Sequence, residues 1–435
     1  MTRMKESGID WIGQIPEEWE VIKVKFFTYM KGRIGWQGLK ADEFIDEGPY
    51  LVTGTDFKNG RVNWDTAYHI SQKRYEQAPE IQLKQGDLLV TKDGTVGKLA
   101  LIDELPDSAS LNSHLLVLRP LFNRYDNHFL YYVLSSLEFK NYFQKVSIGS
   151  TMDSLSQEKM GEFIFALPNI NEQNSISRYL DKKTAQLDKA KALLEKQIQK
   201  LKDYRASLIY ETITKGLDKT VPMKDSGIYW IGKVPQGWGV SKLKNLLKIK
   251  DGTHDTPSYV DSGIPLITTK NINSFSNYID FSTAKNISYK DYILINRRSD
   301  VEYGDILMPM IGTVGGAVQV TTKNSFSIKN VALFKAGFDL IMSKYLYYQL
   351  NSDIVNNQLE FLMSGGVQSF VSISILEQLQ IINPSEKDKK KIVRFLDEKT
   401  QKIDKLIQIK NQQIENINKQ RQTLIYDYVT GKRRV

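Results

Sequence analysis

The sequence predicts an α/β protein that arose by tandem duplication, in which each copy joins a globular α/β domain to one long helix. Two observations lead to this prediction. Blocks of residues recur after about 217 positions, and a heptad pattern of apolar residues closes each copy. At 435 residues the chain is also too long for one ordinary core. We therefore expect two domains, residues 1–167 and 220–383, and two helices, residues 168–219 and 384–435.

The duplication is visible in two pairs of blocks. Met4–Phe27 (MKESGIDWIGQIPEEWEVIKVKFF) returns as Met223–Leu246 (MKDSGIYWIGKVPQGWGVSKLKNL), with more than half of the positions identical. The element Gly-Asp-Leu-Leu…Gly-Thr-Val-Gly of residues 86–97 returns as Gly-Asp-Ile-Leu…Gly-Thr-Val-Gly in residues 304–315. Because two copies are too few for a solenoid, we expect a molecule with pseudo-twofold symmetry in which one copy faces the other.

The first part of each copy has the pattern of a globular α/β domain. Short apolar runs such as Pro49–Thr53 and Leu88–Thr91 lie between clusters of Gly, Asn and Asp, as strands lie between turns. One amphipathic helical stretch is predicted near Tyr125–Val146. The Gly-Asp element predicts a strand followed by a glycine-dependent turn, with Asp87 and Asp305 hydrogen-bonded locally.

The second part of each copy is predicted to be a single long helix. It follows Pro168 in the first copy and Pro384 in the second, and neither Pro nor Gly interrupts it before Gly216 and Gly431. Apolar residues recur every seven positions, which favours a coiled coil over a helix lying along its own domain. Under the expected pseudo-twofold symmetry, the two helices would run antiparallel. Lys410 interrupts the second apolar seam. The residues predicted to pair the helices are Leu180, Leu187, Leu194, Leu201, Leu208, Leu396, Ile403, Ile417 and Leu424.

The composition excludes several classes of chemistry. The chain has no Cys and four scattered His, which excludes disulfides, thiolate zinc sites and a cysteine nucleophile, and leaves no His spacing suited to a metal. The sequence has neither an apolar run long enough to cross a membrane nor the pattern of a signal peptide. We therefore expect a cytoplasmic protein without a membrane partner.

Weak patterns keep an enzyme open as an alternative. Asp107, Glu138 and Lys140 loosely match the metal-binding pattern of a nuclease, and Asn383–Ser385 partly matches the target-amine loop of amino-methyltransferases. Residues 94–99 lack the spacing and the Ser or Thr of a phosphate-binding loop, and they are predicted to form a turn. A stand-alone DNA-cleaving or DNA-modifying enzyme, and a structural coiled-coil adaptor without DNA contact, remain alternatives to a recognition protein.

Four loops differ between the copies and form the predicted recognition surface. Shared positions most simply serve the common fold, whereas differing loops either read different targets or have drifted neutrally in solvent. The loop pairs are Lys31–Lys40 and Lys250–Tyr259, Gly54–Asn59 and Thr269–Ser274, Thr91–Asp93 and Pro309–Ile311, and Ser150–Ser156 and Val367–Ser372. Their polar side chains are of the types that read base edges in the major groove. The candidate DNA-binding residues are Arg33, Trp36, Lys40, Thr55, Lys58, Thr91, Lys92, Asp93, Thr95, Ser150 and Thr151 in the first copy, and Thr253, His254, Lys270, Asn271, Met310, Thr313, Gln368 and Ser369 in the second.

The net charge of +9 indicates an anionic partner, with nucleic acid the first choice. The two predicted domains together hold 34 Lys and Arg against 36 Asp and Glu, whereas the two helical segments hold 25 against 14. The excess positive charge therefore lies in the helices, and the domains alone should attract phosphate weakly. We expect tight DNA binding to need partner chains that supply phosphate contacts.

Several motifs occur together, and each occurs twice. They are the opening Met-Lys-x-Ser-Gly-Ile-x-Trp-Ile-Gly-x-[Ile/Val]-Pro-x-x-Trp, the Gly-Asp element, the helix entry beginning Pro168-Asn-Ile-Asn-Glu-Gln, and the helix end Leu-Ile-Tyr-x-x-[Ile/Val]-Thr at Leu208–Thr214 and Leu424–Thr430. Over nearly the whole chain they resemble the specificity (S) subunit of type I restriction-modification enzymes. The second helix entry departs from the family pattern, with Asp388-Lys389 where Glu-Gln is usual.

The resemblance implies a non-catalytic role in DNA recognition. In that family each globular part is a target recognition domain that reads one half of a split, asymmetric sequence in double-stranded DNA, and the helices are spacers that set the distance between the half-sites. It implies two modification subunits, which methylate adenine with S-adenosylmethionine, and restriction subunits, which use ATP and magnesium. This chain itself is expected to hold no cofactor and no metal.

Overall fold

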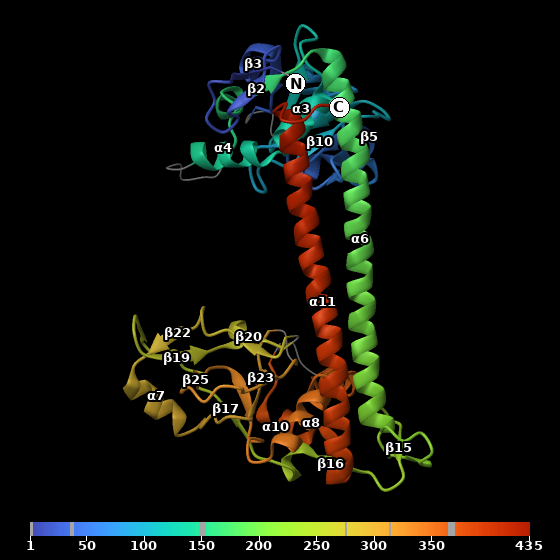
Figure 1. Cartoon of the computed structure of the whole chain (residues 1–435), viewed down its shortest axis with the longest axis vertical. Coiled ribbons are helices and arrows are strands. Elements are labelled where there is room, and N and C mark those ends of the chain that lie inside the picture. Colours follow the sequence, from blue (N-terminus) through green and yellow to red (C-terminus); the bar gives the residue numbers. More distant parts are fainter. Residues whose placement is uncertain (1–2, 35–38, 148–153, 275, 313–314, 364–369) are drawn as a thin grey trace. The chain divides into compact units, whose positions relative to one another are not determined.

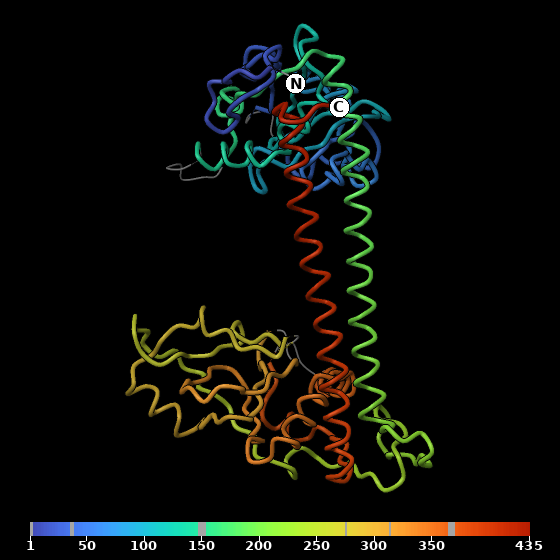
Figure 2. Tube along the Cα trace, viewed as in Figure 1, coloured from blue at the N-terminus to red at the C-terminus, as the bar shows by residue number. Residues whose placement is uncertain are grey.

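The computed structural model describes residues 3–34, 39–147, 154–274, 276–312, 315–363 and 370–435 (Figures 1 and 2). The chain forms two compact units. Unit 1 contains Met1–Leu194 and Gln412–Val435, and unit 2 contains Glu195–Asn411. The boundary between the units therefore falls inside the long helices and not between the two sequence copies. Each unit combines the globular part of one copy with helical segments from both copies.

The main sheet of unit 1 is buried on both faces. Its strands are β4 (Thr28–Lys31), β6 (Phe57–Lys58), β7 (Arg61–Val62), β9 (Leu88–Thr91), β10 (Leu99–Leu101) and β12 (Leu115–Pro120). They lie in the order β4-β12-β9-β10-β7-β6, and only β10 and β7 pair in parallel. Along β9, Leu88 and Val90 belong to one apolar core and Leu89 to another, because successive side chains of a strand face opposite sides.

Smaller sheets complete the strands of unit 1. Their strands are β1 (Met4–Glu6), β2 (Gln14–Pro16), β3 (Glu20–Lys23), β5 (Phe44–Val52), β8 (Tyr68–Ile70), β11 (Ala109–Leu111) and β13 (Ile164–Leu167). One sheet has the order β11-β5-β8, with β11 parallel to β5, and the antiparallel pairs β1-β2 and β3-β13 stand apart from it. The mixture of parallel and antiparallel pairs agrees with the α/β class predicted from the sequence.

Two helices replace the single stretch predicted near Tyr125–Val146. α3 (Asn127–Ser135) ends and α4 (Leu137–Ser147) begins at Ser136, whose Oγ donates to the carbonyl oxygen of Val133 at 2.6 Å. A serine hydroxyl bonded to a nearby carbonyl competes with the helix ladder, which explains the break. The shorter helices of unit 1 are α1 (Val24–Phe27), α2 (Gln72–Glu76) and α5 (Gln157–Gly161), with 3-10 turns at Ala41–Glu43, Trp64–Thr66 and Pro79–Ile81.

Unit 2 repeats this architecture. Its strands are β14 (Met223–Asp225), β15 (Lys233–Pro235), β16 (Gly239–Lys242), β17 (Ile249–Asp251), β18 (Tyr259–Val260), β19 (Ile264–Ile267), β20 (Ile272–Asn273), β21 (Tyr278–Ile279), β22 (Lys285–Ile287), β23 (Ile306–Pro309), β24 (Val318–Gln319), β25 (Ser327–Ile328), β26 (Val331–Phe334) and β27 (Gln380–Asn383). The order β17-β26-β23-β24 matches β4-β12-β9-β10 of unit 1, and a second sheet has the order β18-β22-β19-β25. The remaining strands form the pairs β14-β15, β16-β27 and β20-β21.

The helices of unit 2 follow the same plan. A serine again separates two helices, because Ser352 lies between α8 (Leu340–Leu350) and α9 (Asp353–Met363) and its Oγ donates to the carbonyl oxygen of Gln349 at 2.6 Å. The shorter helices are α7 (Tyr289–Asn296) and α10 (Ile373–Gln378), with 3-10 turns at Leu243–Asn245 and Thr269–Asn271. The break between the paired helices is therefore a property of the duplicated fold.

The Gly-Asp element builds the same buried ion pair in each unit. Asp87 and Asp305 each accept a hydrogen bond from the backbone N–H three residues earlier, so the predicted local hydrogen bonds are confirmed. Each carboxylate also contacts a cation from the neighbouring strand of the sheet, Arg119 on β12 at 2.6 Å in unit 1 and Lys335 directly after β26 at 2.7 Å in unit 2. Both aspartates are buried, and a buried charge without a partner would strongly destabilise the fold.

The two long helices are α6 (Ile170–Lys215) and α11 (Glu386–Val429), and within each unit they run side by side and antiparallel (Figure 1). In unit 1, Asp188 pairs with Arg421 at 3.5 Å, and in unit 2, Arg205 donates to Asp404 at 3.0 Å. Asp188 and Asp404 are equivalent positions of the two copies, and so are Arg205 and Arg421. The same ion pair therefore forms in both units, but α6 supplies the aspartate in unit 1 and the arginine in unit 2. None of the helices in the described ranges has both the length and the apolar character needed to cross a membrane.

The predicted pairing residues are about half of the helix seam. Leu180, Leu396 and Ile403 are buried, and the other six are partly exposed. A second set lies three or four residues from the first, and the heptad pattern did not reveal it because most of its members are polar. Tight coiled-coil packing of the seam stays a prediction. The members of the second set, all at least partly buried, are Thr184, Lys191, Ile198, Arg205, Thr400, Ile407, Ile414 and Arg421.

The end of each long helix completes the core of the other copy's globular part. Ile425, Tyr428 and Val429 of α11 are buried in the core of unit 1, beside residues of the first copy. Ile209 and Ile213 of α6 are buried in the core of unit 2, beside residues of the second copy. Neither globular core is complete without the helix that the other copy supplies.

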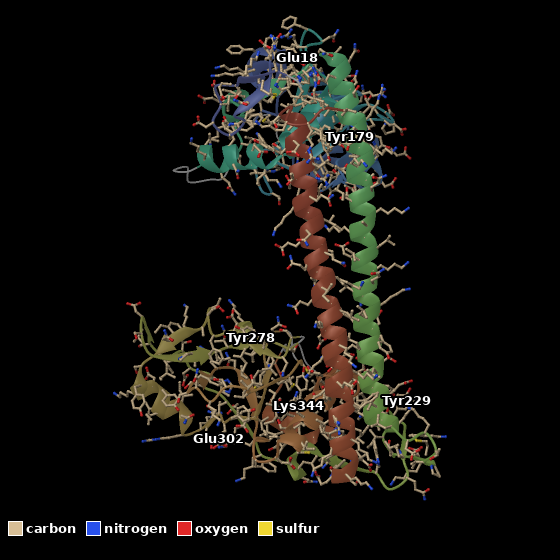
Figure 3. All side chains as sticks on the ribbon, viewed as in Figure 1. Glu18, Tyr179, Tyr229, Tyr278, Glu302 and Lys344 are labelled. Carbon is tan, nitrogen blue, oxygen red and sulfur yellow. The ribbon has the colours of Figure 1, made fainter. Side chains whose placement is uncertain are left out.

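A tyrosine and a cation fix the start of each long helix against its own globular part. In unit 1, Tyr132 Oη and His128 Nε2 both bond the carboxylate of Asp181 on α6, at 2.5 and 3.0 Å. In unit 2, Tyr348 and Lys344 bond the equivalent aspartate of α11, Asp397, at 2.6 and 3.1 Å. Lys344 is labelled in Figure 3. The hydrogen bond to Asp181 raises the pKa of His128 above its ordinary value, and burial opposes this shift less strongly.

We predict that the contribution of His128 to the stability of unit 1 depends on pH. Because the pKa is raised in the folded state, the stabilisation is complete below the unfolded pKa of about 6.5 and is lost as the pH rises through the folded pKa. The variant His128→Lys copies Lys344 of unit 2 and should lose this dependence, since lysine stays charged over that range. Thermal unfolding at pH values on both sides of neutrality measures the difference between the two proteins. Parallel pH profiles would contradict the prediction.

We also predict that a fragment of residues 1–219 forms a dimer. Alone, it lacks Ile425, Tyr428 and Val429, and the equivalent end of α6 from a second fragment can fill the same core. Sedimentation equilibrium measures the mass. The matched control is the fragment carrying Ile209→Asp, which should stay monomeric because a buried unpaired charge prevents the exchange. A wild-type fragment that is monomeric and folded would be inconsistent with the exchange.

Candidate nucleic-acid interface

In unit 1, the loops that differ between the copies converge at one edge of the main sheet. The backbone N–H of Leu155 donates to Lys92 O at 2.7 Å, which joins the loop before α5 to the end of β9. Gly54 lies so close to Thr91 that a Cβ there would stand 2.8 Å from the threonine methyl group. A Cβ on Gly32 would stand 3.8 Å from Lys92 Nζ, so the first loop reaches the same place.

Unit 2 repeats the convergence. The N–H of Val371 donates to Met310 O at 2.9 Å, which is the counterpart of the Leu155 contact. The N–H of Asn330 donates to Thr253 O at 3.1 Å, which brings in the first loop of the copy. Residues 269–274 line one recess together with Pro309, Ile311, Gly312, Gly315 and Gly316, so the second and third loops also meet. Loops far apart in the sequence thus form one surface in each unit.

The candidate residues separate into three groups by position. Exposed are Lys40, Thr55, Lys58, Thr95, His254 and Lys270; partly exposed are Lys92, Asp93 and Thr253; and buried are Arg33, Thr91, Asn271 and Met310. The exposed and partly exposed residues lie on the converging loops and stay candidates for DNA contact. The remaining predicted residues, Trp36, Ser150, Thr151, Thr313, Gln368 and Ser369, lie outside the described residues.

The interpretation of Arg33 as a surface DNA contact is wrong for this structure. Its side chain is buried, and the guanidinium donates to Leu111 O at 2.9 Å and to Ser110 Oγ at 2.9 Å. Burial lowers the pKa of Arg33 to about 10, so the side chain stays charged at neutral pH. Arg33 joins the first loop to the neighbouring β11, and it supports the surface from beneath.

Three further candidates also have structural roles. Thr91 Oγ1 donates to Thr95 O at 2.5 Å and accepts from Lys98 N at 2.9 Å, which closes the glycine turn. Asn271 Oδ1 accepts from Thr268 N at 2.9 Å, as the carboxylate of Asp56 does from Thr53 N in unit 1. Met310 is part of the apolar core of unit 2. The sequence did not separate these residues from their exposed neighbours because loop position alone does not give side-chain direction.

A fifth loop of the surface was missed. It joins β11 to β12 in unit 1, where His114 Nδ1 contacts the carboxylate of Asp93, and it carries Asn330 in unit 2. Asn330 Oδ1 contacts His254 Nδ1, and His254 Nε2 contacts the buried carboxylate of Asp251. His114 and Asn330 are equivalent positions with different residues, so a comparison of the copies extended to this turn could have found them.

Polar side chains hold the second copy's first loop in place. Asp251 also accepts two hydrogen bonds from Arg298, both at 2.7 Å, so its buried carboxylate has a cationic partner. Paired donors from one guanidinium fix both distance and orientation. His254 therefore projects from an ordered base, with its ring about 6.3 Å from that of Phe370. Such a loop is preorganised to meet a ligand.

The structure gives no support to the nuclease pattern. Within the described ranges, no group of three or more His, Asp or Glu side chains is arranged to hold a metal ion. Glu138 is half-buried, burial raises its pKa, and its Oε2 has no hydrogen-bond partner among the described atoms. The converging edges carry exposed donors and acceptors instead, which is the chemistry of recognition.

The chain is similar to known proteins over most of its length. The sequence profile of the type I restriction modification DNA specificity domain matches residues 16–203 and 235–419. The putative type I restriction enzyme MjaX specificity subunit of Methanocaldococcus jannaschii is 25% identical over 436 residues, covering 98% of this chain and 96% of the relative. The EcoBI specificity subunit of Escherichia coli is 23% identical, covering 80% of this chain and 73% of the relative.

A solved structure has the same fold. A chain from a structure described as showing complex assembly and conformational transition of the type I R-M system superposes with a TM-score of 0.68. The alignment covers 96% of this chain and 99% of that chain at 15% sequence identity.

We predict that the main effect of Arg33→Ala is to lower the stability of the fold. The change leaves Leu111 O and Ser110 without their buried charged donor, so the free energy of unfolding should fall by about 2–3 kcal/mol. Lys58→Ala, on the exposed hairpin of the same unit, should change it by less than about 0.5 kcal/mol. Urea unfolding followed by tryptophan fluorescence compares the two variants. Unaltered stability in Arg33→Ala would return this residue to the list of DNA contacts.

Proposed function

This chain belongs to the type I restriction-modification DNA specificity family, and from that premise we propose that each of its units reads one half of a bipartite, asymmetric DNA site. The chain is a recognition subunit and not the catalyst. The observation that carries the proposal is the convergence of the differing loops at one sheet edge in both units. Two edges with the same scaffold and different side chains can read two different sequences.

The long helices supply the second part of the proposal. Each helix runs continuously from a contact with its own globular part to the core of the other copy's globular part. We infer that the helix pair fixes the spacing between the two half-sites, since both units must meet compatible faces of the DNA at once. Sequence and spacing would then be specified together.

The partners of the chain follow from the family and the charge. We propose two modification subunits, which carry S-adenosylmethionine and methylate an adenine that is turned out of the duplex. Restriction subunits that use ATP and magnesium would join the same assembly. Taken together, the globular parts hold no excess of Lys and Arg, so the partner subunits would supply most phosphate contacts. We propose that the assembly meets DNA in the cytoplasm.

A structural adaptor without DNA contact is the second candidate. The excess of Lys and Arg in the helices supports this candidate, because basic helices can bind an acidic protein as well as DNA. The loops do not favour it, because an adaptor needs no two sets of differing polar side chains on duplicated edges. DNA recognition therefore accounts for more of the structure.

We predict that the two half-sites can be exchanged separately. Residues 1–167 are replaced by the same part of another family member, and the chain is expressed with its modification subunits. One half of the methylated motif should change while the other half and the spacing persist, because each unit carries its own recognition edge. Methylation-sensitive sequencing of cellular DNA gives the motif.

The matched control replaces residues 220–383 and should change only the other half. A change in both halves after a single exchange would rule out independent reading. A motif that stays whole after both exchanges would remove DNA recognition from this chain.

A further inference from the structure

A short hairpin stands at the recognition edge of unit 2. Its strands β20 and β21 pair Asn273 with Tyr278, so these two side chains are cross-strand neighbours on one face. Tyr278 is labelled in Figure 3. Both are exposed, Tyr278 by 54%. The N–H of Gln319 on β24 donates to Asn277 Oδ1 at 2.7 Å, which ties the turn of the hairpin to the main sheet. The pair is therefore presented on an anchored element.

The hairpin forms one wall of an open recess of about 670 Å³. The opposite wall is formed by Pro309, Ile311, Gly312, Gly315 and Gly316. Gly316 lies so close to Ser274 that a Cβ there would stand 2.5 Å from its Oγ. Ile272 and Ile311 contribute apolar surface to the recess. Apolar surface beside exposed polar groups is the combination that a nucleobase edge with a methyl group would meet.

The charges of the recess favour base edges over phosphate. Its described lining carries one cation, Lys270, and one anion, Asp280. Hydrogen bonds from Ser282 and Thr283 lower the pKa of Asp280, which keeps the carboxylate ionised near neutral pH. A lining without net charge has little attraction for a phosphodiester, whereas the amide of Asn273 and the phenol match donors and acceptors on bases.

We propose that the β20–β21 hairpin is the element through which unit 2 reads its half-site, with Asn273 and Tyr278 in contact with base edges in the major groove. A two-stranded ribbon fits that groove. Ser276 N donates to Asn273 Oδ1 at 3.2 Å, which orients the amide and leaves its NH2 group to donate to a base. This inference rests on the proposed function. It assigns base reading to Asn273, which lies in a predicted loop but was not a candidate residue, and to Tyr278, which lies outside the predicted loops.

The equivalent hairpin of unit 1 has different chemistry. Strands β6 and β7 pair Lys58 with Arg61, and the N–H of Leu101 on β10 donates to Gly60 O at 2.9 Å, so this hairpin is anchored at the corresponding strand. Arg61 also pairs with Asp103. At the same place in the fold, unit 1 thus presents two cations, and unit 2 presents an amide and a phenol. Such a difference is what independent reading of unlike half-sites needs.

The test is Asn273→Asp in the full-length chain, expressed with its modification subunits. The substitution keeps the shape of the side chain and replaces its NH2 donor with an acceptor. Methylation-sensitive sequencing should show a change of preferred base at one position of the half-site read by unit 2, by about tenfold or more, with the other half unchanged. Tyr278→Phe, which removes only the hydroxyl group, should relax the preference in the same half-site.

Lys290→Gln is the matched control, because Lys290 is an exposed cation on α7 and does not line the recess. It should leave the motif unchanged. Motifs identical to wild type in both Asn273→Asp and Tyr278→Phe would overturn the inference, as would an equal loss of methylation at every sequence. If the wild-type chain with its partners methylates no bipartite motif, the proposed function itself fails, so the two failures are distinct.

Discussion

The exchange of helix ends between the two copies is the constraint on which the rest of the molecule depends. The apolar residues at the end of α11 are buried under the opening block of the first copy, and those at the end of α6 are buried under the opening block of the second. Glycines that follow the helices lie against a tryptophan in each case, Gly431 against Trp19 and Gly216 against Trp238. A side chain at either position would meet the indole ring at about van der Waals distance or closer. The opening block occurs in both copies because each one packs against the end of a long helix. Each helix has to be continuous to reach the opening block of the other copy.

Equivalent positions keep their role in both units even where the residue changes. Arg119 and Lys335 both neutralise the buried aspartate of the Gly-Asp element, and Asp56 and Asn271 both close the turn before the recognition hairpin. The side chains above this scaffold keep no such role. The free energy of folding comes mainly from the buried contacts of this scaffold. The exposed side chains can therefore be substituted, and the DNA sequence that they recognise can change, while the fold stays the same.

The sequence was enough to predict the duplication, the long helices and the loops of the surface, because repeats and apolar periodicity are local signals. It could not predict the direction of each side chain. Arg33 and Thr91 are buried while Thr55 and Lys58 are exposed, although all four lie in the predicted loops. The break at Ser136 and the polar half of the helix seam were also hidden, because one depends on a single hydroxyl group and the other on partners from a distant helix. The hairpin pair of unit 2 was missed because its cross-strand neighbours appear only once the register is known.

The distribution of charge connects the fold with the way the chain would act. Taken together, the globular parts hold no excess of Lys and Arg over Asp and Glu, whereas the helical segments do. Part of the excess in the helices is already used in contacts such as Arg205 with Asp404 and Arg421 with Asp188. The recess that we propose to read bases in unit 2 carries balanced charge in its described lining, so it would discriminate between sequences without holding every sequence tightly. A subunit of this kind gains affinity from partners that contact phosphate and adds selectivity itself. Separating the two tasks lets the reading surface change while the strength of binding to DNA stays the same.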